Sequence, residues 1–128
     1  MHIVSLLKRL VSRRDPFLSR DRVSVLLIAA GLAFNVGQWI YLALVVSPYE
    51  EVMYLHYNIY FGVDLVGQWY RIFLMPAIGT GIMILNIIFA RQLHKKSFIL
   101  SRLQLSFSLA CQVLLVVASY LIMRQNTL

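Results

Sequence analysis

The sequence contains a single cysteine, Cys111, which lies inside a long apolar run. One cysteine forms no disulfide within its own chain, and a thiol among apolar neighbours has little reactivity. Cysteine usage therefore gives no indication of a redox compartment. The sequence also lacks a glycine-rich phosphate-binding loop and any set of nucleophile, base and orienting group. We therefore expect a protein that is not an enzyme and that has no cofactor.

Charged residues are absent from three long stretches of the chain, Val23–Tyr49, Ile72–Ala90 and Leu103–Met123. Each stretch is close to the roughly 20 residues that a helix needs to span about 30 Å of hydrocarbon. Because no charge lies in the middle of these stretches, a proton relay or an ion pump is disfavoured. The sequence predicts transmembrane helices at 23–47, 70–91 and 101–123, with loops at 48–69 and 92–100.

Hydrophobic residues make up 60% of the chain, whereas about 45–50% is usual for soluble domains. A soluble protein of 128 residues has too little interior to hide so much apolar surface. We therefore predict an all-α integral membrane protein, with residues 1–128 forming one domain in the lipid bilayer.

The net charge of +7 comes from basic residues that gather in two places. Six precede Val23, and four surround the predicted 92–100 loop: Lys8, Arg9, Arg13, Arg14, Arg20, Arg22, then Arg91, Lys95, Lys96 and Arg102. Only Arg71 and Arg124 remain for the other side of the membrane. Nucleic acid is disfavoured because no soluble domain is left to carry a basic face. The bias predicts a multi-pass protein of the plasma membrane with a cytoplasmic amino terminus and an external carboxyl terminus.

The amino-terminal segment shows the pattern of an amphipathic helix. Ile3, Leu7 and Leu10 recur at helical spacing beside basic residues, which predicts a helix at 1–16 lying in the cytoplasmic interface. Ser19 or Asp21 could cap the first spanning helix. The apolar run after Arg22 is too long for the core of a cleaved signal peptide. We interpret it as a retained membrane helix.

The outer loop is the most distinctive segment. Seven of the residues from Ser47 to Tyr70 are aromatic. From Leu55 to Phe61, apolar and polar residues alternate in a way typical of a short extended segment. We expect an ordered cap whose Leu55, Ile59 and Phe61 face the bundle. Further on, Gly62 and Gly67 would permit turns, Asp64 would cap the next helix, and an aromatic belt would lie at Trp69, Tyr70 and Tyr120.

A family resemblance rests on this loop. His56-Tyr57-Asn58, followed by Gly62, Asp64 and Trp69 and then by an apolar helix with Pro76, resembles a domain of the SdpI-type toxin-immunity membrane proteins of bacteria. That domain forms their amino-terminal part, and the resemblance covers about residues 45–90. It implies a loop outside the cytoplasm that senses or blocks a peptide or toxin, with His56, Asn58, Gly62, Asp64 and Trp69 as candidate contact residues.

Plainer interpretations of the same loop stay open. Tyr and Trp favour bilayer interfaces whatever the function, and His56 and Asp64 can simply hydrogen-bond the loop shut. A metal site is disfavoured because His56 and Asp64 are the only obvious ligands, with Glu50 and Glu51 further off. Zinc needs three or four ligands at recognisable spacing. Haem is disfavoured because His56 and His94 are predicted on opposite sides of the membrane.

Uncharged polar residues also occur inside the predicted helices. Residues of this kind usually join helices through hydrogen bonds, and here they are Asn35, Gln38, Asn86, Ser108 and Gln112. Small residues recur every fourth position, at Ala29, Ala33 and Gly37 and again at Ala77 and Gly81, which favours close helix packing in a bundle or an oligomer. Pro76, with Gly79 and Gly81 nearby, predicts a bend in the second helix.

Two functions remain in view. The first is a non-enzymatic interaction protein whose outer loop recognises a partner, in the manner of immunity or sensing. The alternative is an accessory subunit that docks onto another membrane protein or onto copies of itself. A small transporter is disfavoured because it needs a polar stripe that continues through the membrane, and the sequence does not show one.

Overall fold

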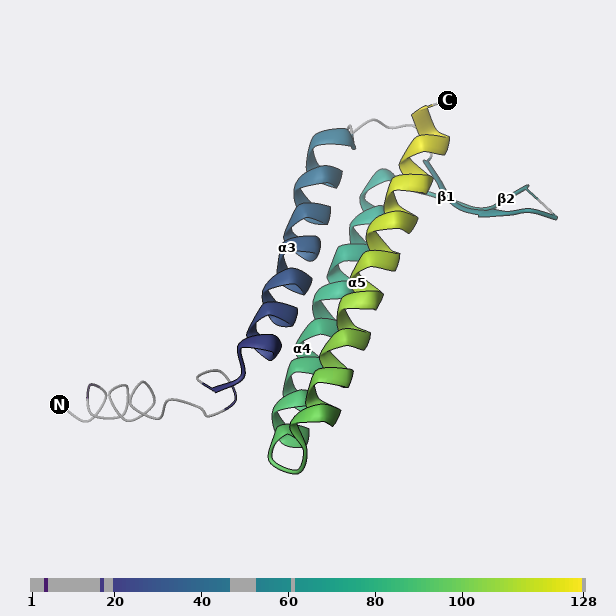
Figure 1. Cartoon of the computed structure of the whole chain (residues 1–128). Helices are drawn as coiled ribbons and strands as arrows, with labels where there is room; N and C mark the ends of the chain where they lie inside the picture. The colour runs from purple at the N-terminus through teal and green to yellow at the C-terminus, as the bar shows by residue number, and fades with distance from the viewer. Residues whose placement is uncertain (1–3, 5–16, 18–19, 47–52, 61, 128) are drawn as a thin grey trace.

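A computed structural model describes Val4, Phe17 and residues 20–46, 53–60 and 62–127, with the backbone alone at 53–58 and 62–66. In chain order the elements are α3 (Arg22–Val45), β1 (Met53–Asn58), β2 (Gly62–Gly67), the 3-10 helix η1 (Trp69–Phe73), α4 (Leu74–His94) and α5 (Phe98–Thr127). The three α-helices lie side by side along one long axis (Figure 1).

Three helical segments are long and apolar enough to cross a membrane, namely Arg22–Val45, Trp69–His94 and Phe98–Asn126. The prediction of three such helices is confirmed, and they fit a multi-pass membrane protein. The expected amphipathic helix at 1–16 lies outside the described residues, apart from Val4, which is helical and exposed.

The bundle has two distinct ends. One holds Asp21 and the short connection between α4 and α5, and we call it the turn end. The other holds the end of α3, the two strands and the last turns of α5, and we call it the hairpin end (Figure 1). Helix α5 packs against both other helices, whereas α3 and α4 contact each other less.

Buried residues recur at alternating steps of three and four along each helix. In α3 they are Ser24, Gly31, Asn35, Gln38 and Leu42, in α4 Pro76, Gly79, Met83, Asn86 and Ala90, and in α5 Ser101, Leu105, Ser108, Gln112, Ser119 and Met123. This spacing is the seven-residue repeat of helices that wind around one another with a left-handed twist. The seam is rich in small and polar residues, while large aliphatic side chains such as Leu44 and Leu114 are exposed. That distribution suits lipid as the surrounding solvent.

The small-residue rows predicted to pack helices inside the bundle do not lie on this seam. Ala29, Ala33 and Ala77 are exposed, and a side chain built at Gly37 or Gly81 would meet nothing within 4 Å. Of the two predicted roles for these rows, packing within the bundle is therefore excluded, and packing in an oligomer stays a prediction. A four-residue spacing drifts off a seam that alternates three and four, and the buried glycines of the three helices are Gly31 and Gly79 instead.

The connection between α4 and α5 is shorter than the predicted loop at 92–100. It consists of Lys95–Ser97, with the backbone N–H of Lys96 and of Ser97 bonded to the carbonyl of Leu93. Arg91 and His94 lie in the last turn of α4, where positive charge complements the helix dipole, and Arg102 lies in α5. Charged residues thus mark where the apolar stretch ends and not where the helix ends.

Pro76 occupies the first turn of α4, directly after the 3-10 helix η1. A proline in the first helical turn loses no hydrogen bond, because the N–H groups there have no partner within the helix. The second membrane segment is therefore not one continuous α-helix from Trp69 onward. The change from 3-10 to α geometry comes just before Pro76, and the predicted bend itself stays a prediction.

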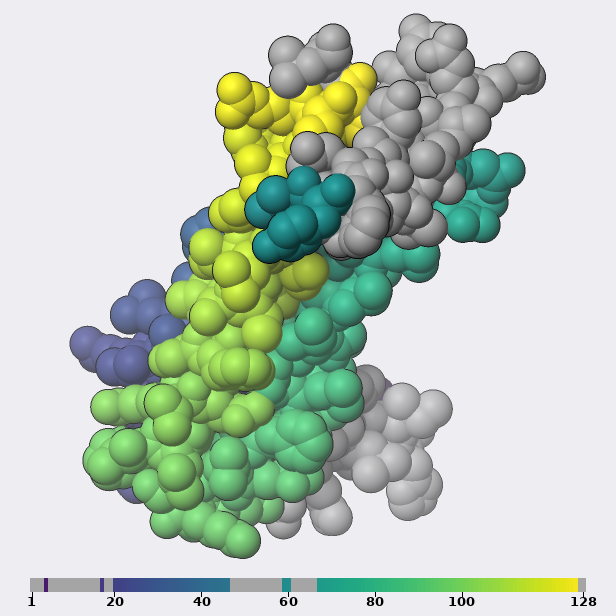
Figure 2. Space-filling model, turned by 90° about the vertical axis from the view of Figure 1, so that its right-hand side faces the viewer, coloured from purple at the N-terminus to yellow at the C-terminus, as the bar shows by residue number. Residues whose placement is uncertain are grey.

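The outer loop contains an antiparallel two-stranded sheet, so the described part of the chain is not helical throughout. Its backbone pairs run from Met53 with Gly67 to Asn58 with Gly62. The predicted extended segment from Leu55 to Phe61 corresponds to β1, which starts and ends slightly earlier. The hairpin leaves the bundle sideways, across the direction of the helices (Figure 1), and Figure 2 views the molecule from the side to which it points.

Candidate functional site

Four of the five candidate loop residues lie together on the hairpin. His56 and Asn58 belong to β1, and Gly62 and Asp64 belong to β2. Asn58 and Gly62 are directly paired across the turn, while His56 is opposite Leu65. The backbone therefore brings together residues that the sequence places up to eight positions apart.

The pairing of the two strands is irregular near His56. Its register shifts between Tyr54 and His56 and again between His56 and Tyr57, so the ladder passes over Leu55 on one strand and Asp64 on the other. Such bulges bend a strand and increase its twist, and they often accompany functional sites. Asp64 lies within β2, and the capping positions of η1 and α4 are Gln68 and Phe73. The prediction that Asp64 caps the next helix is wrong because the strand continues through it.

The tip of the hairpin exposes two large side chains. Ile59 is 87% exposed and Tyr60 is 88% exposed. The expectation that Ile59 faces the bundle is wrong, because the turn carries it away from the helices (Figure 1). The side chains of Leu55 and Phe61, predicted to face the bundle as well, lie outside the described residues.

Trp69, the fifth candidate, belongs to the base of the hairpin and not to its tip. Its ring makes edge contacts with Tyr70 and Phe73, with centroids 5.9 and 6.4 Å away. It also packs against a buried apolar cluster of Leu42, Val46, Ile72 and Met123. Tyr120 lies at the same end, with its ring centroid 6.4 Å from that of Tyr41. Trp69 therefore anchors the hairpin on the bundle, and aromatic rings gather at this end as the belt prediction expects.

A polar layer joins all three helices in the middle of the bundle. Asn35 Nδ2 donates to the Pro76 carbonyl at 3.1 Å and to Gln112 Oε1 at 3.2 Å. Gln112 Nε2 donates to the Gly79 carbonyl at 2.7 Å. The Thr80 hydroxyl lies 2.9 Å from both Asn35 Oδ1 and the Pro76 carbonyl oxygen. The prediction that Asn35 and Gln112 join helices is confirmed, and each satisfies polar groups of α4.

Further hydrogen bonds lie above and below this layer. Gln38 Nε2 donates to Ser119 Oγ at 2.6 Å and to the Leu115 carbonyl at 3.1 Å, which ties α3 to α5. Nearer the turn end, Gln104 Nε2 donates to Asn86 Oδ1 and ties α5 to α4. The predicted contacts of Gln38 and Asn86 between helices are thus confirmed. Their partners Ser119 and Gln104, like Thr80, were missed, although the seven-residue repeat of small and polar residues would have indicated Ser119.

Buried polar side chains thus follow one another along α5, at Ser101, Ser108, Gln112 and Ser119. The sequence analysis predicted no such stripe because it singled out Ser108 and Gln112 but not Ser101 and Ser119, which lie on the same buried face. The stripe is a packed seam and not an open path, since Ser101, Gln112 and Ser119 are fully buried and Gln112 is bonded to both neighbouring helices. It serves helix association, which is the role expected of polar groups in lipid.

An ion pair closes the turn end. Asp21 is the N-cap of α3, where its carboxylate accepts from the Ser24 backbone N–H at 3.3 Å and from the Ser24 hydroxyl at 2.7 Å. Arg102 of α5 contacts both carboxylate oxygens, and His94 Nδ1 lies 4.0 Å away. The Arg102 hydrogen bonds, more than those from Ser24, hold the pKa of Asp21 well below its ordinary value although burial opposes them. The cap was predicted, but its pairing with Arg102 was not.

No family model matches this chain, and neither a curated protein nor a solved structure matches it. The function must therefore be argued from the geometry. Within the described part of the chain, no three His, Cys, Asp or Glu residues lie close enough together to hold a metal ion. What the geometry offers is an anchored hairpin with an exposed apolar tip on a tightly bonded helical bundle.

Proposed function

We propose that the protein is a non-enzymatic membrane protein that binds a partner through its hairpin. The observation that carries the proposal is the exposure of Ile59 and Tyr60 at the tip, on a hairpin that points away from its own bundle (Figures 1 and 2). Trp69 fixes the base of the hairpin, so the tip is presented from a firm support. Tyrosine is among the residue types that most often dominate the binding energy of protein interfaces.

The proposed orientation places the turn end in the cytoplasm and the hairpin outside it. Described basic residues gather at the turn end, at Arg20, Arg22, Arg91, Lys95, Lys96 and Arg102, while Arg71 and Arg124 lie at the hairpin end. Basic residues are favoured on the cytoplasmic side of membrane proteins. The amino terminus is then cytoplasmic and the carboxyl terminus external, in the plasma membrane of a bacterium.

The partner that we propose is a peptide or toxin outside the cytoplasm. The resemblance to SdpI-type immunity proteins supports this choice, since His56, Asn58, Gly62 and Asp64 all belong to the hairpin. Among the described residues, β2 has a strand on one side only, β1, and an extended peptide can add to such a strand as a further one.

The test compares a tip variant with a base variant in the full chain. Ile59→Ser should leave the melting temperature in detergent unchanged, because this side chain is 87% exposed, yet abolish protection of cells against the toxin and crosslinking of toxin to the hairpin. Trp69→Ala should lower the melting temperature, because the ring packs on the apolar cluster. Full protection by the tip variant, measured at equal membrane abundance, would contradict the proposal.

A second candidate, an accessory subunit of a larger membrane complex, is favoured by one observation. The rows Ala29–Ala33–Gly37 and Ala77–Gly81 are exposed on the helices, where small residues let another helix approach closely. An accessory subunit should co-purify with its complex in fixed stoichiometry in mild detergent, and Gly37→Leu should abolish that association. Purification of the protein alone, with toxin protection intact in Gly37→Leu, would leave the hairpin proposal as the better one.

A further inference from the structure

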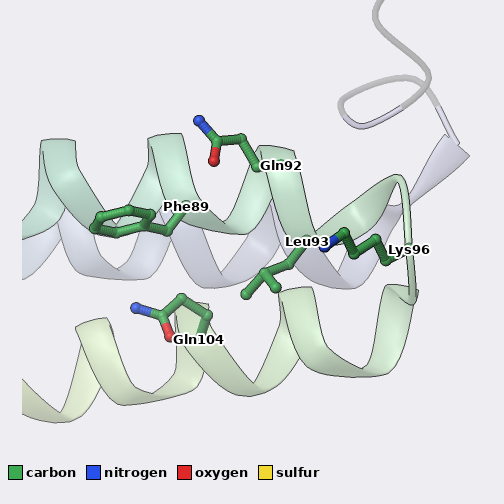
Figure 3. Close-up of a pocket in the computed structure, with 5 residues that line it drawn as sticks. All are labelled: Phe89, Gln92, Leu93, Lys96 and Gln104. Carbon is green, nitrogen blue, oxygen red and sulfur yellow. The ribbon is translucent and has the colours of Figure 1, made fainter.

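A groove lies between α4 and α5 at the turn end of the bundle, separate from the hairpin tip and about 30–45 residues further along the chain. It is lined by Phe89, Gln92, Leu93, Lys96 and Gln104 and has a volume of about 360 Å³. That volume falls in the range of roughly 300–1,000 Å³ of ordinary ligand pockets. Figure 3 shows Phe89, Gln92 and Leu93 on α4, Gln104 on α5, and Lys96 reaching back from the connecting turn.

The lining of the groove is divided by chemistry. Phe89 and Leu93 are one helical turn apart and form an apolar row, with Phe89 half exposed. Gln92 and Lys96 form a polar row beside it with the same spacing, and both are exposed. Along the helix axis Phe89 lies about 6 Å deeper in the bundle than Leu93. The groove therefore runs from a polar, positively charged mouth to an apolar inner part.

Among the described residues, the charged side chains at the mouth are all basic. Lys95 and Lys96 are both exposed, Arg91 lies one turn before Lys95, and the chain has no Asp or Glu after Asp64. The one described carboxylate at this end, Asp21, is bound by Arg102. Within the described residues, Lys96 forms no ion pair with a carboxylate. On the inner side, Gln104 is fixed by its bond to Asn86, which keeps its amide at the wall of the groove.

We infer that this groove binds an anionic phospholipid, with the phosphate at Lys96 and Gln92 and the first part of an acyl chain against Phe89 and Leu93. The helices are long enough to cross a membrane, so the turn end lies at an interface whichever way the chain is oriented. Basic pockets between membrane helices are suited to acidic headgroups, and one basic residue near the surface contributes about a five-fold gain in affinity. This inference does not depend on the function proposed for the hairpin.

The chain offers a matched control for the test. Lys95 is the neighbour of Lys96 and equally exposed, but it does not line the groove. The full-length protein is stripped of lipid in detergent and titrated with phosphatidylglycerol, with phosphatidylcholine of the same acyl chains, and with inorganic phosphate. Bound lipid is counted by native mass spectrometry, and the shift in melting temperature is recorded for the wild type, Lys96→Gln, Lys95→Gln and Phe89→Ala.

Phosphatidylglycerol should bind in preference to phosphatidylcholine, and Lys96→Gln should weaken its binding about five-fold. Phe89→Ala should weaken the binding of both lipids, because it removes the apolar wall, while Lys95→Gln should change little. Equal losses in Lys95→Gln and Lys96→Gln would overturn the inference, since they would reflect general attraction to a basic end. So would equal binding of the two lipids. Binding of inorganic phosphate as strong as that of the lipid would likewise overturn it, because the apolar part of the groove would then contribute nothing.

Discussion

Arg102 and Asp21 are 81 residues apart in the chain, and the guanidinium nevertheless contacts both carboxylate oxygens at 2.9–3.2 Å. The same carboxylate caps the first turn of α3 through Ser24. One acidic side chain therefore completes the start of one helix and joins it to another. The contributions of the cap and of the ion pair can be separated by comparing variants of Asp21.

The ion pair should make stability depend on acid. The folded protein holds the pKa of Asp21 below its ordinary value of 3.8, so the carboxylate stabilises the fold at pH values above about 4 and loses this contribution as the pH falls further. The melting temperature of the protein in detergent should therefore drop between about pH 5 and pH 2. Asp21→Asn keeps a capping residue but not the charge, and it should lower the melting temperature at neutral pH and flatten this part of the profile.

The cap itself is isolated by comparing two variants. Asp21→Ala removes both the cap and the ion pair, so it should be less stable than Asp21→Asn by about 0.5–2 kcal/mol. Chemical unfolding in mixed micelles gives the difference. Identical stabilities for the two variants would show that Ser24 does not need the side-chain oxygen to satisfy its N–H.

Gly79 lies where α4 passes closest to the polar layer. A methyl group there would come within 2.9 Å of Gln112 Oε1 and 3.0 Å of Asn35 Nδ2 and of Leu115 Cδ1. Gly79→Ala should therefore destabilise the protein by about 1–3 kcal/mol, the usual cost of overpacking. Gly81, two residues further, has nothing within 4 Å of the same position, so Gly81→Ala is the control and should cost nothing. Equal effects would indicate that helix propensity, and not packing, decides the outcome.

The bond between Asn35 and Gln112 should be measurable as a coupling free energy. In a cycle of Asn35→Leu, Gln112→Leu and the double variant, the coupling should be about 0.6 kcal/mol and no more than about 1.7, as for other polar contacts in membrane proteins. Each single variant leaves polar groups of the other helices without a partner. The double variant should therefore be more stable than the sum of the single effects implies. Strict additivity of the two effects would mean that this contact contributes nothing of its own.

The proposed orientation is tested at the last residue. A reporter active only outside the cytoplasm, fused to Leu128, should be active, and a reporter active only in the cytoplasm should not. Fusion of the two reporters within the Lys95–Ser97 turn should give the opposite pattern. The same activity at both positions would mean that α5, the helix between them, does not cross the membrane.

The three helices were predictable because charge-free runs of this length have few other structures available to them in lipid. The ends of the helices were less predictable, since residues such as His94 and Arg102 stay helical beyond the apolar stretch. The hairpin was recognised only as an extended segment. Strand pairing depends on two segments together, and β2, with Gly62 and Gly67 at its ends, has no alternation that a single-segment pattern would detect.

The polar contacts inside the bundle were also predictable only in part. Asn35 and Gln112 were recognisable one by one, because uncharged polar residues in lipid need partners. Which partner each would choose was not recognisable, since two of the acceptors are backbone carbonyls, those of Pro76 and Gly79, which leave no trace in the sequence. The exposure of Ile59 was missed because an alternating pattern does not tell where a strand ends and a turn begins.

The three-residue connection at Lys95–Ser97 has a consequence for how the chain enters a membrane. Because so short a connection forces α4 and α5 to run in opposite directions, we expect these two helices to enter the membrane as one antiparallel pair. The basic residues at this turn then determine on which side of the membrane the turn stays. This in turn sets the direction of both helices. Helix α3, with Arg20 just before it and Arg22 as its first residue, carries its own orienting charges. We therefore expect the helices to enter the membrane in the order in which they are synthesised, α3 first and then α4 and α5 together.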